Sequence, residues 1–267
     1  MNRFLWNVGA TLNLNFGAYV SDEQAGGNVS EAARRDDFDI LTLRNARWDH
    51  VAQFPDTKAV HIVRDPRDIV VSGYFSHLKT HKIANEEYAR ERERLQSLSK
   101  EEGLIETLNG INARTLADLQ DWKTGESPNI LEFRLEEMSG EPMKYLKKIL
   151  LHADLMRESE GKDDPLDLKI WGQINQVWKR SGGKTLIHKK LPRVSEGAFQ
   201  RLEKWVSFER LSGGRKPGEV NTNSHYRSGK HGDWKEHFTP EVVSVFKSRF
   251  PTAVSSLGYE KDENWGL

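Results

Sequence analysis

Short runs of apolar, largely β-branched residues alternate along the chain with segments in which apolar residues recur every three or four positions. The first kind of pattern predicts β-strands, and the second predicts amphipathic helices. The strand-type runs cover residues 38–43, 59–63 and 129–134. The helical patterns cover residues 4–12, 71–78 and 143–150. Strands that alternate with helices imply βαβ units and a parallel sheet, so the sequence predicts an α/β fold with ligands at the carboxyl ends of the strands.

Three further segments have a distinct composition. Residues 84–124 are strongly charged and carry sparse leucines, which predicts either a solvated helical insertion or a substrate-side lid. Residues 181–194 and 212–230 are rich in Gly, Ser, Asn and Lys, so we expect loops there.

The composition of the chain excludes several classes of protein. Lys and Arg number 40, as do Asp and Glu, so no global charge favours a nucleic-acid or membrane partner. The chain has no cysteine, which excludes disulfides and thiolate metal sites and favours a reducing compartment. It has no apolar run long enough to span a bilayer, and its first residues lack the layout of a signal peptide. We therefore predict a cytoplasmic protein, and any anion site must be local.

One junction between a predicted strand and a predicted helix carries such a local charge. The sequence VHIVRDPRDIVVSGYF (60–75) places Arg64 between them, followed by Asp65 as a helix N-cap and Pro66 at the first helical position. A helix that starts there presents backbone N–H groups and a positive dipole end, and Arg64 adds a phosphate donor. Ser72 can offer a hydroxyl to the same anion. The alternative is that Arg64 pairs with Asp68 and closes the helix start.

A second basic element lies near the C-terminus. In HYRSGKHGDWKEHFTPE (225–241), two glycines bracket Arg227, Lys230 and His231. Glycines let backbone amides approach an anion closely. An ordinary glycine turn before a helix that starts near Thr239 is the alternative.

Taken together, these elements resemble the sulfotransferase family that uses 3′-phosphoadenosine-5′-phosphosulfate (PAPS) as donor. The similarity lies in VRDPRDIVVSGYF, EFRLEEM with the helix that follows, VSFERLSGG, YRSGKHGDWKEHFT and LGYEKDENW, in this order from about residue 38 onward. The resemblance implies a P-loop-NTPase-like parallel sheet flanked by helices, in a single domain over residues 1–267.

The resemblance also implies roles for individual residues. Arg64 and Ser72 would bind the 3′-phosphate of the donor, and Arg227, Ser228 and Gly229 would close over it. Phe208 would lie against the adenine. Trp234 belongs to the C-terminal signature and is expected to fasten the loop rather than touch the sulfate.

Two family features have no match. The family begins with a strand and a loop resembling P-K-S-G-T-T-W, which holds the 5′-phosphosulfate, whereas residues 3–12 resemble the helix after that loop. The first strand and the phosphosulfate loop are thus expected to be missing from residues 1–267. Relatives commonly place a histidine base where this chain reads Leu43-Arg44-Asn45. His50 is the nearest histidine and is our candidate base, with Asp49 as an alternative.

The sequence therefore predicts a PAPS-dependent sulfotransferase that transfers a sulfuryl group to a hydroxyl or amine of a small-molecule or carbohydrate acceptor, without a metal. The alternative is a catalytically inactive relative that binds adenosine 3′,5′-bisphosphate (PAP). A P-loop kinase is disfavoured because no G-x-x-x-x-G-K-[ST] sequence occurs. Residues 235–243 weakly resemble the short dimer segment of the family, so a homodimer is possible.

Overall fold

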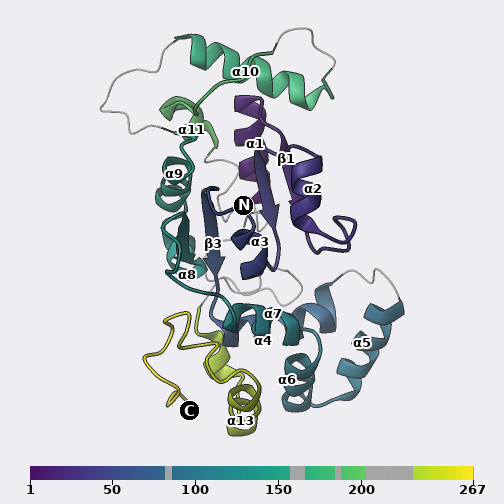
Figure 1. Cartoon of the computed structure of the whole chain (residues 1–267). Coiled ribbons are helices and arrows are strands. Elements are labelled where there is room, and N and C mark those ends of the chain that lie inside the picture. Colours follow the sequence, from purple (N-terminus) through teal and green to yellow (C-terminus); the bar gives the residue numbers. More distant parts are fainter. Residues whose placement is uncertain (82–85, 157–165, 184–187, 203–213, 215–230, 267) are drawn as a thin grey trace. The chain divides into compact units, whose positions relative to one another are not determined.

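The computed structural model describes residues 1–81, 86–156, 166–183, 188–202, 214 and 231–266 (Figure 1). The predicted donor ligands Phe208, Arg227, Ser228 and Gly229 lie outside these residues. The chain forms two compact units. Unit 1 comprises residues 1–60, 129–131 and 141–214, and unit 2 comprises residues 61–128, 132–140 and 215–267.

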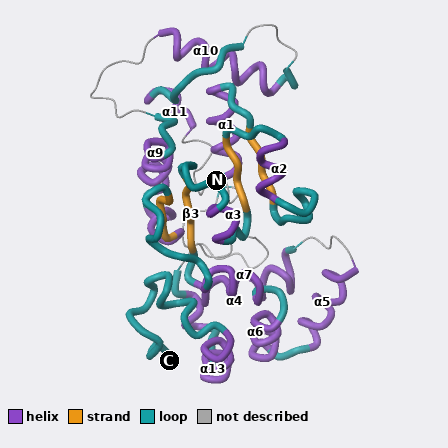
Figure 2. Tube along the Cα trace, viewed as in Figure 1, coloured by secondary structure: helices purple, strands orange, loops and turns teal. Residues whose placement is uncertain are grey.

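Helices predominate over strands in both units (Figure 2). Unit 1 contains α1 (Asn2–Leu12), β1 (Phe16–Tyr19), α2 (Val29–Arg35), β2 (Ile40–Leu43), α3 (Trp48–Ala52), α9 (Pro142–His152), α10 (Leu166–Arg180) and α11 (Glu196–Leu202). Unit 2 contains α4 (Pro66–Phe75), the π-helical turn η1 (Ser76–Thr80), α5 (Glu86–Ser97), α6 (Lys100–Asn109), α7 (Ala113–Gln120), α8 (Leu135–Gly140), the 3₁₀ turn η3 (Asp233–Glu236) and α13 (Pro240–Arg249). Strands β3 (Ala59–Val63) and β4 (Ile130–Arg134) each contain residues of both units.

The three predicted strands are present as β2, β3 and β4, and β3 has the predicted bounds. β1 and β2 pair in parallel, from Phe16 opposite Ile40 to Tyr19 opposite Leu43, and β3 pairs with β4. The α/β class, with parallel strands flanked by helices, is confirmed. The sequence did not predict β1, because FGAY is only four residues long and contains a glycine. That glycine is required, since a Cβ on Gly17 would lie 2.6 Å from the ring of Phe38.

The predicted helices are also present. α1 and α9 cover their predicted patterns, and α4 together with the π-helical turn η1 covers residues 71–78. α13 begins at Pro240, next to the predicted start near Thr239, and the charged segment forms the helices α5, α6 and α7. In unit 1, α2 lies beside β1 (Figure 1), and its Val29 and Ala32 form an apolar cluster with Leu41 and Leu43 of β2. No helix in the described part of the chain is long and apolar enough to cross a membrane.

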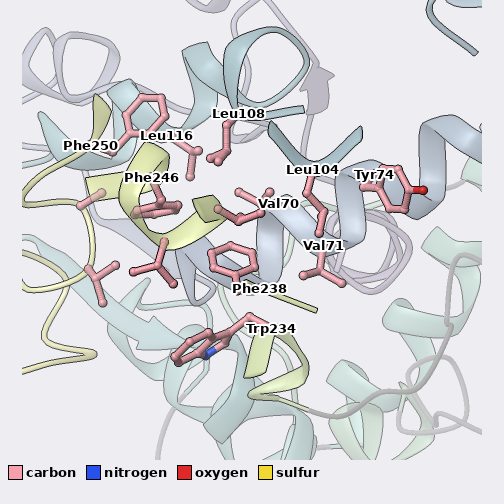
Figure 3. Packing of buried hydrophobic residues seen from close by; sticks show 14 of the residues in the cluster. Val70, Val71, Tyr74, Leu104, Leu108, Leu116, Trp234, Phe238, Phe246 and Phe250 are labelled. Atoms are coloured by element: carbon pink, nitrogen blue, oxygen red, sulfur yellow. The ribbon is translucent and has the colours of Figure 1, made fainter. Parts of the chain in front are cut away.

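The apolar core of unit 2 joins α4, α6, α7, η3 and α13 (Figure 3). Phe246 of α13 lies at its centre, fully buried, and its ring contacts Phe238, Phe250 and Trp265 edge-on or tilted. The segment predicted to resemble a dimer contact, residues 235–243, places Phe238, Val242 and Val243 in this core. Burial of these side chains therefore holds the C-terminal segment against α4 within one copy of the chain.

A polar cluster in unit 1 surrounds His50. Arg47 donates to Asp22 at 2.7 Å and to Asp49 at 3.0 Å, and the ring of His50 contacts Asp22 at 3.3 Å. Asp22 also accepts from the backbone N–H of Val29 at the start of α2. Hydrogen bonding from Arg47 lowers the pKa of Asp22 to about 2. The cluster thus ties the loop before α2 to α3 through an ionised carboxylate.

We predict that Phe246→Ala destabilises unit 2 by about 3–5 kcal/mol, because it removes a fully buried aromatic ring and leaves a cavity. Urea unfolding followed by circular dichroism measures the loss. Ser244→Ala, an exposed position on the same helix, is the matched control and should change stability by less than about 0.5 kcal/mol. Equal effects of the two substitutions would show that α13 does not contribute to the core.

We also predict that Asp22→Asn lowers stability at pH 7 by about 1–3 kcal/mol, because the ionised carboxylate accepts charged hydrogen bonds. The pKa of Asp22 is lowered in the folded state, so its stabilisation is present above the ordinary value of 3.8 and is lost as the pH falls toward about 2. Urea titrations from pH 7 to pH 2 should show the two proteins converging. Asp56→Asn, at an exposed position, is the control. A gap that stays constant with pH would contradict the ionised pair.

Candidate functional site

The strand-to-helix junction has the predicted local structure. β3 ends at Val63, Asp65 caps α4, and Pro66 is the first helical residue. Asp65 Oδ1 accepts from the backbone N–H of Arg67 at 2.9 Å, and the N–H of Asp65 itself donates to Glu136 at 3.0 Å. The N–H groups of Asp65 and Arg67 are therefore already used, and Pro66 has none. An anion at this junction would need side-chain donors as well as backbone amides.

Arg64 is the side chain placed to hold an anion. It is half-buried and forms no hydrogen bond or ion pair with any described residue. The alternative, a direct ion pair of Arg64 with Asp68, is not formed; burial raises the pKa of Asp68 and the charge of Arg64 opposes that rise, but both oxygens of Asp68 accept backbone N–H groups instead. Ser72 lies on α4, about 9 Å along the helix axis from Pro66, and its hydroxyl also has no described partner. Both predicted phosphate ligands, Arg64 just before α4 and Ser72 on α4, are therefore available to bind an anion.

Arg67, the second arginine of the motif, has a structural role. Its guanidinium is almost fully buried and forms a bidentate ion pair with Asp65, at 2.8 and 3.0 Å, and a second pair with Glu260 at 2.7 Å. It also stacks against the rings of Trp234 and Trp265, at 4.0 and 4.9 Å. These three hydrogen bonds and the two ring contacts fix the guanidinium, so Arg67 fastens the C-terminal segment to the junction.

Asp68 joins the junction to the C-terminal signature. This fully buried carboxylate accepts from the backbone N–H of Gly232 at 2.7 Å and of Trp234 at 2.9 Å. Burial raises the pKa of Asp68, although these two hydrogen bonds and the charge of Arg64 oppose that effect. Gly232 adopts a left-handed conformation with φ of 76°, which suits glycine. Asp68 and Gly232 are 164 positions apart in the sequence, so the two motifs meet within one unit.

A second carboxylate organises the other side of the junction. Glu136 of α8 accepts from the N–H of Asp65 and, at 2.7 Å, from the hydroxyl of Tyr259. Burial, with the Glu136 contact next, raises the pKa of that hydroxyl. Arg134, at the end of β4, donates to the carbonyl oxygen of Gly258 and stacks on the ring of Tyr259. The EFRLEEM and LGYEKDENW motifs therefore support the residues around Arg64.

Sequence reasoning did not identify these supporting residues. Asp68 was considered only as a partner of Arg64, and Glu136 and Tyr259 were only parts of motifs. One signal was present: two acidic residues, Asp65 and Asp68, lie in the first turn of one helix, where a single cap is sufficient. The indole of Trp234 is buried against Arg67, which is consistent with the fastening role predicted for it.

His50, the candidate base, is buried and has both ring nitrogens in contacts. Nδ1 accepts from the backbone N–H of Arg47 at 3.2 Å, so Nε2 carries the proton and faces Asp22. Both ring nitrogens of His50 are therefore occupied by contacts within unit 1 in this conformation. Asp49 pairs with Arg47, which lowers its pKa. Within the described residues, no group of three or more His, Asp or Glu side chains is arranged to hold a metal ion.

We predict that Asp68→Asn loosens the C-terminal segment. An amide has one oxygen to accept the two N–H donors, and its NH₂ group would face a donor, so the substitution should cost about 1–3 kcal/mol. Hydrogen exchange at the amides of Gly232 and Trp234 should become roughly 5-fold faster or more. Glu236→Gln, an exposed position on η3, is the control. Unchanged protection of both amides in Asp68→Asn would contradict this role.

Comparisons with known proteins show what this chain is similar to. A family model described as the sulfotransferase domain matches residues 49–162, a range that contains the β3–α4 junction and β4. A flavonol 3-sulfotransferase from Flaveria bidentis is 26% identical over 223 residues, which are 78% of this chain and 58% of that protein. The chain thus spans little more than half the length of this curated relative.

A solved structure is also similar. The crystal structure of mouse sulfotransferase SULT7A1 complexed with PAP has 16% sequence identity, covers 94% of this chain and 80% of its own, and superposes with a TM-score of 0.49. The chain is thus similar to sulfotransferases, and the range matched by the domain model contains the β3–α4 junction where the predicted motif lies.

Proposed function

We propose that the chain binds PAPS and transfers its sulfuryl group to a hydroxyl or amine of an acceptor. The observation that carries this proposal is the half-buried guanidinium of Arg64, which has no described partner although acidic groups surround the junction. Asp65 forms an ion pair with Arg67, and Asp68 accepts hydrogen bonds from the C-terminal segment. Arg64 is thereby kept from internal ion pairs and left for an external anion, for which the 3′-phosphate is the candidate.

The remaining donor ligands belong to the same proposal. Ser72 would add a hydroxyl to the 3′-phosphate. Arg227, Ser228 and Gly229 would reach it from the segment that leads to Gly232, and Phe208 would stack on adenine. The anchoring of Gly232 by Asp68 supports this assignment, because it fixes to α4 a point three residues after Gly229 in the sequence. Catalysis would depend mainly on positioning and on stabilising charge on the departing 5′-phosphate.

The acceptor is proposed only as a class, a small molecule or carbohydrate with a hydroxyl or amine. A cytoplasmic location and a homodimer, both predicted from the sequence, also remain proposals. The assignment of residues 1–267 to one sulfotransferase domain, with residues 84–124 as an insertion or lid, is also a proposal. Residues 84–124 supply Leu95, Leu104 and Leu108 to the core of unit 2.

We predict that Arg64→Ala weakens binding of PAP by about 2–3 kcal/mol and binding of AMP far less, because only PAP carries a 3′-phosphate. Isothermal titration calorimetry with both nucleotides measures the difference. Arg114→Ala, an exposed arginine on α7, is the matched control and should change neither affinity. Equal losses for PAP and AMP would show that Arg64 does not read the 3′ group, and no binding of PAP by the unsubstituted chain would contradict the proposed function.

A further inference from the structure

The helix that carries Ser72 continues into an unusual turn. After α4 ends at Phe75, residues Ser76–Thr80 form the π-helical turn η1, and the backbone N–H of His81 donates to the carbonyl oxygen of Ser76 at 2.7 Å. Turns of this kind are rare and occur often at functional sites, because they displace side chains from the regular helical positions. Here the turn brings His81 back over Ser76, whose hydroxyl lies 3.0 Å from Nδ1 of His81.

This turn and helix α5 together build a carboxylate–imidazole pair. Nδ1 of His77 lies 2.6 Å from Oε2 of Glu91, and both side chains are largely buried, at 13% and 27% exposed. A carboxylate at Nδ1 holds the proton on that nitrogen and leaves the lone pair on Nε2. Nε2 of His77 has no hydrogen-bond partner among the described residues. His77 therefore has the arrangement of an oriented base, which His50 lacks.

Neighbouring groups hold the His77 ring in place. The ring of His81 stacks on that of His77, with centroids 4.6 Å apart, and the ring of Tyr88 lies 5.6 Å away. Arg92 of α5 donates to the carbonyl oxygens of His77 and His81. Among the described residues, the titratable and charged groups that contact the pair are His81 at the end of the turn and Tyr88 and Arg92 of α5. These contacts restrict the orientation of the His77 ring, as the supporting residues of a functional side chain do.

The pair lies on the same helical run as the proposed phosphate ligand. His77 follows Ser72 by five residues, about 8 Å along the helix axis, and both belong to unit 2. We propose that His77 is the general base of this chain and that Glu91 is its positioning residue, an inference that rests on the proposed function. It also assigns part of the charged segment 84–124 to the site, since α5 supplies Glu91.

The proposed step transfers a proton to His77 and the sulfuryl group to the acceptor. Nε2 of His77 takes the proton of the acceptor hydroxyl while the acceptor oxygen forms a bond to the sulfur of PAPS. The bond between that sulfur and the bridging oxygen of the 5′-phosphate breaks, and its electron pair leaves on the phosphate of PAP. The imidazolium, stabilised by the carboxylate of Glu91, then releases its proton to water.

The test measures sulfuryl transfer from radiolabelled PAPS to 2-naphthol, as a hydroxyl probe, together with PAP affinity by calorimetry. We expect His77→Gln to lower kcat at least about 100-fold and Glu91→Gln about 10-fold, with PAP affinity changed less than about 2-fold in both. His77→Gln should also lose the low-pH limb of the rate profile, and imidazole added to His77→Gly should restore part of the rate. Lys79→Gln, an exposed position on the same turn, is the control and should match the unsubstituted chain.

The outcomes separate this inference from the proposed function. If the chain binds PAP and transfers sulfate while the His77 variants keep full kcat, the base assignment is wrong and the sulfotransferase proposal stands. If the chain binds PAP without any transfer to the probe, or if PAP affinity falls together with kcat in the His77 variants, the pair is structural and the assignment is overturned. If the chain does not bind PAP, both proposals fail.

Discussion

The candidate site depends on one buried carboxylate. Asp68 lies in the first turn of α4, fully removed from solvent, and a carboxylate in that position is tolerated only when its oxygens are hydrogen-bonded. The N–H groups of Gly232 and Trp234 provide those bonds, so the C-terminal segment must lie against the start of α4. Trp234 then covers the buried guanidinium of Arg67, whose charge is balanced by Asp65 and Glu260. Each group in this network needs the others to offset its own cost of burial.

This arrangement explains why two arginines three residues apart differ so completely. Arg67 is held by two carboxylates and two indole rings, whereas Arg64 has no described partner. The acidic residues of the motif already bind Arg67 and backbone N–H groups, and they form no ion pair with Arg64. The network therefore supports the candidate anion site and leaves Arg64 without an internal ion pair among the described residues. The proposed recognition of a donor 3′-phosphate requires both properties.

Local patterns were sufficient to predict much of this fold. The apolar runs predicted β2, β3 and β4, and the residues Asp65-Pro66 predicted the start of α4, because capping and strand burial are encoded within a few neighbouring residues. β1 was missed because its four residues carry no such signal. The roles of Asp68, Glu136 and Tyr259 could not be predicted, since their partners lie 71 to 166 positions away in the sequence. His50 was chosen as base by its distance in sequence from the family position, and its contacts with Arg47 and Asp22 could not be predicted from that distance.

The most direct test of this account is a crystal structure of the chain with adenosine 3′,5′-bisphosphate. We predict that the 3′-phosphate lies within hydrogen-bonding distance of the guanidinium of Arg64 and the hydroxyl of Ser72, while Asp68 keeps its bonds to Gly232 and Trp234. A nucleotide bound elsewhere, with Arg64 turned to an internal carboxylate, would contradict the account.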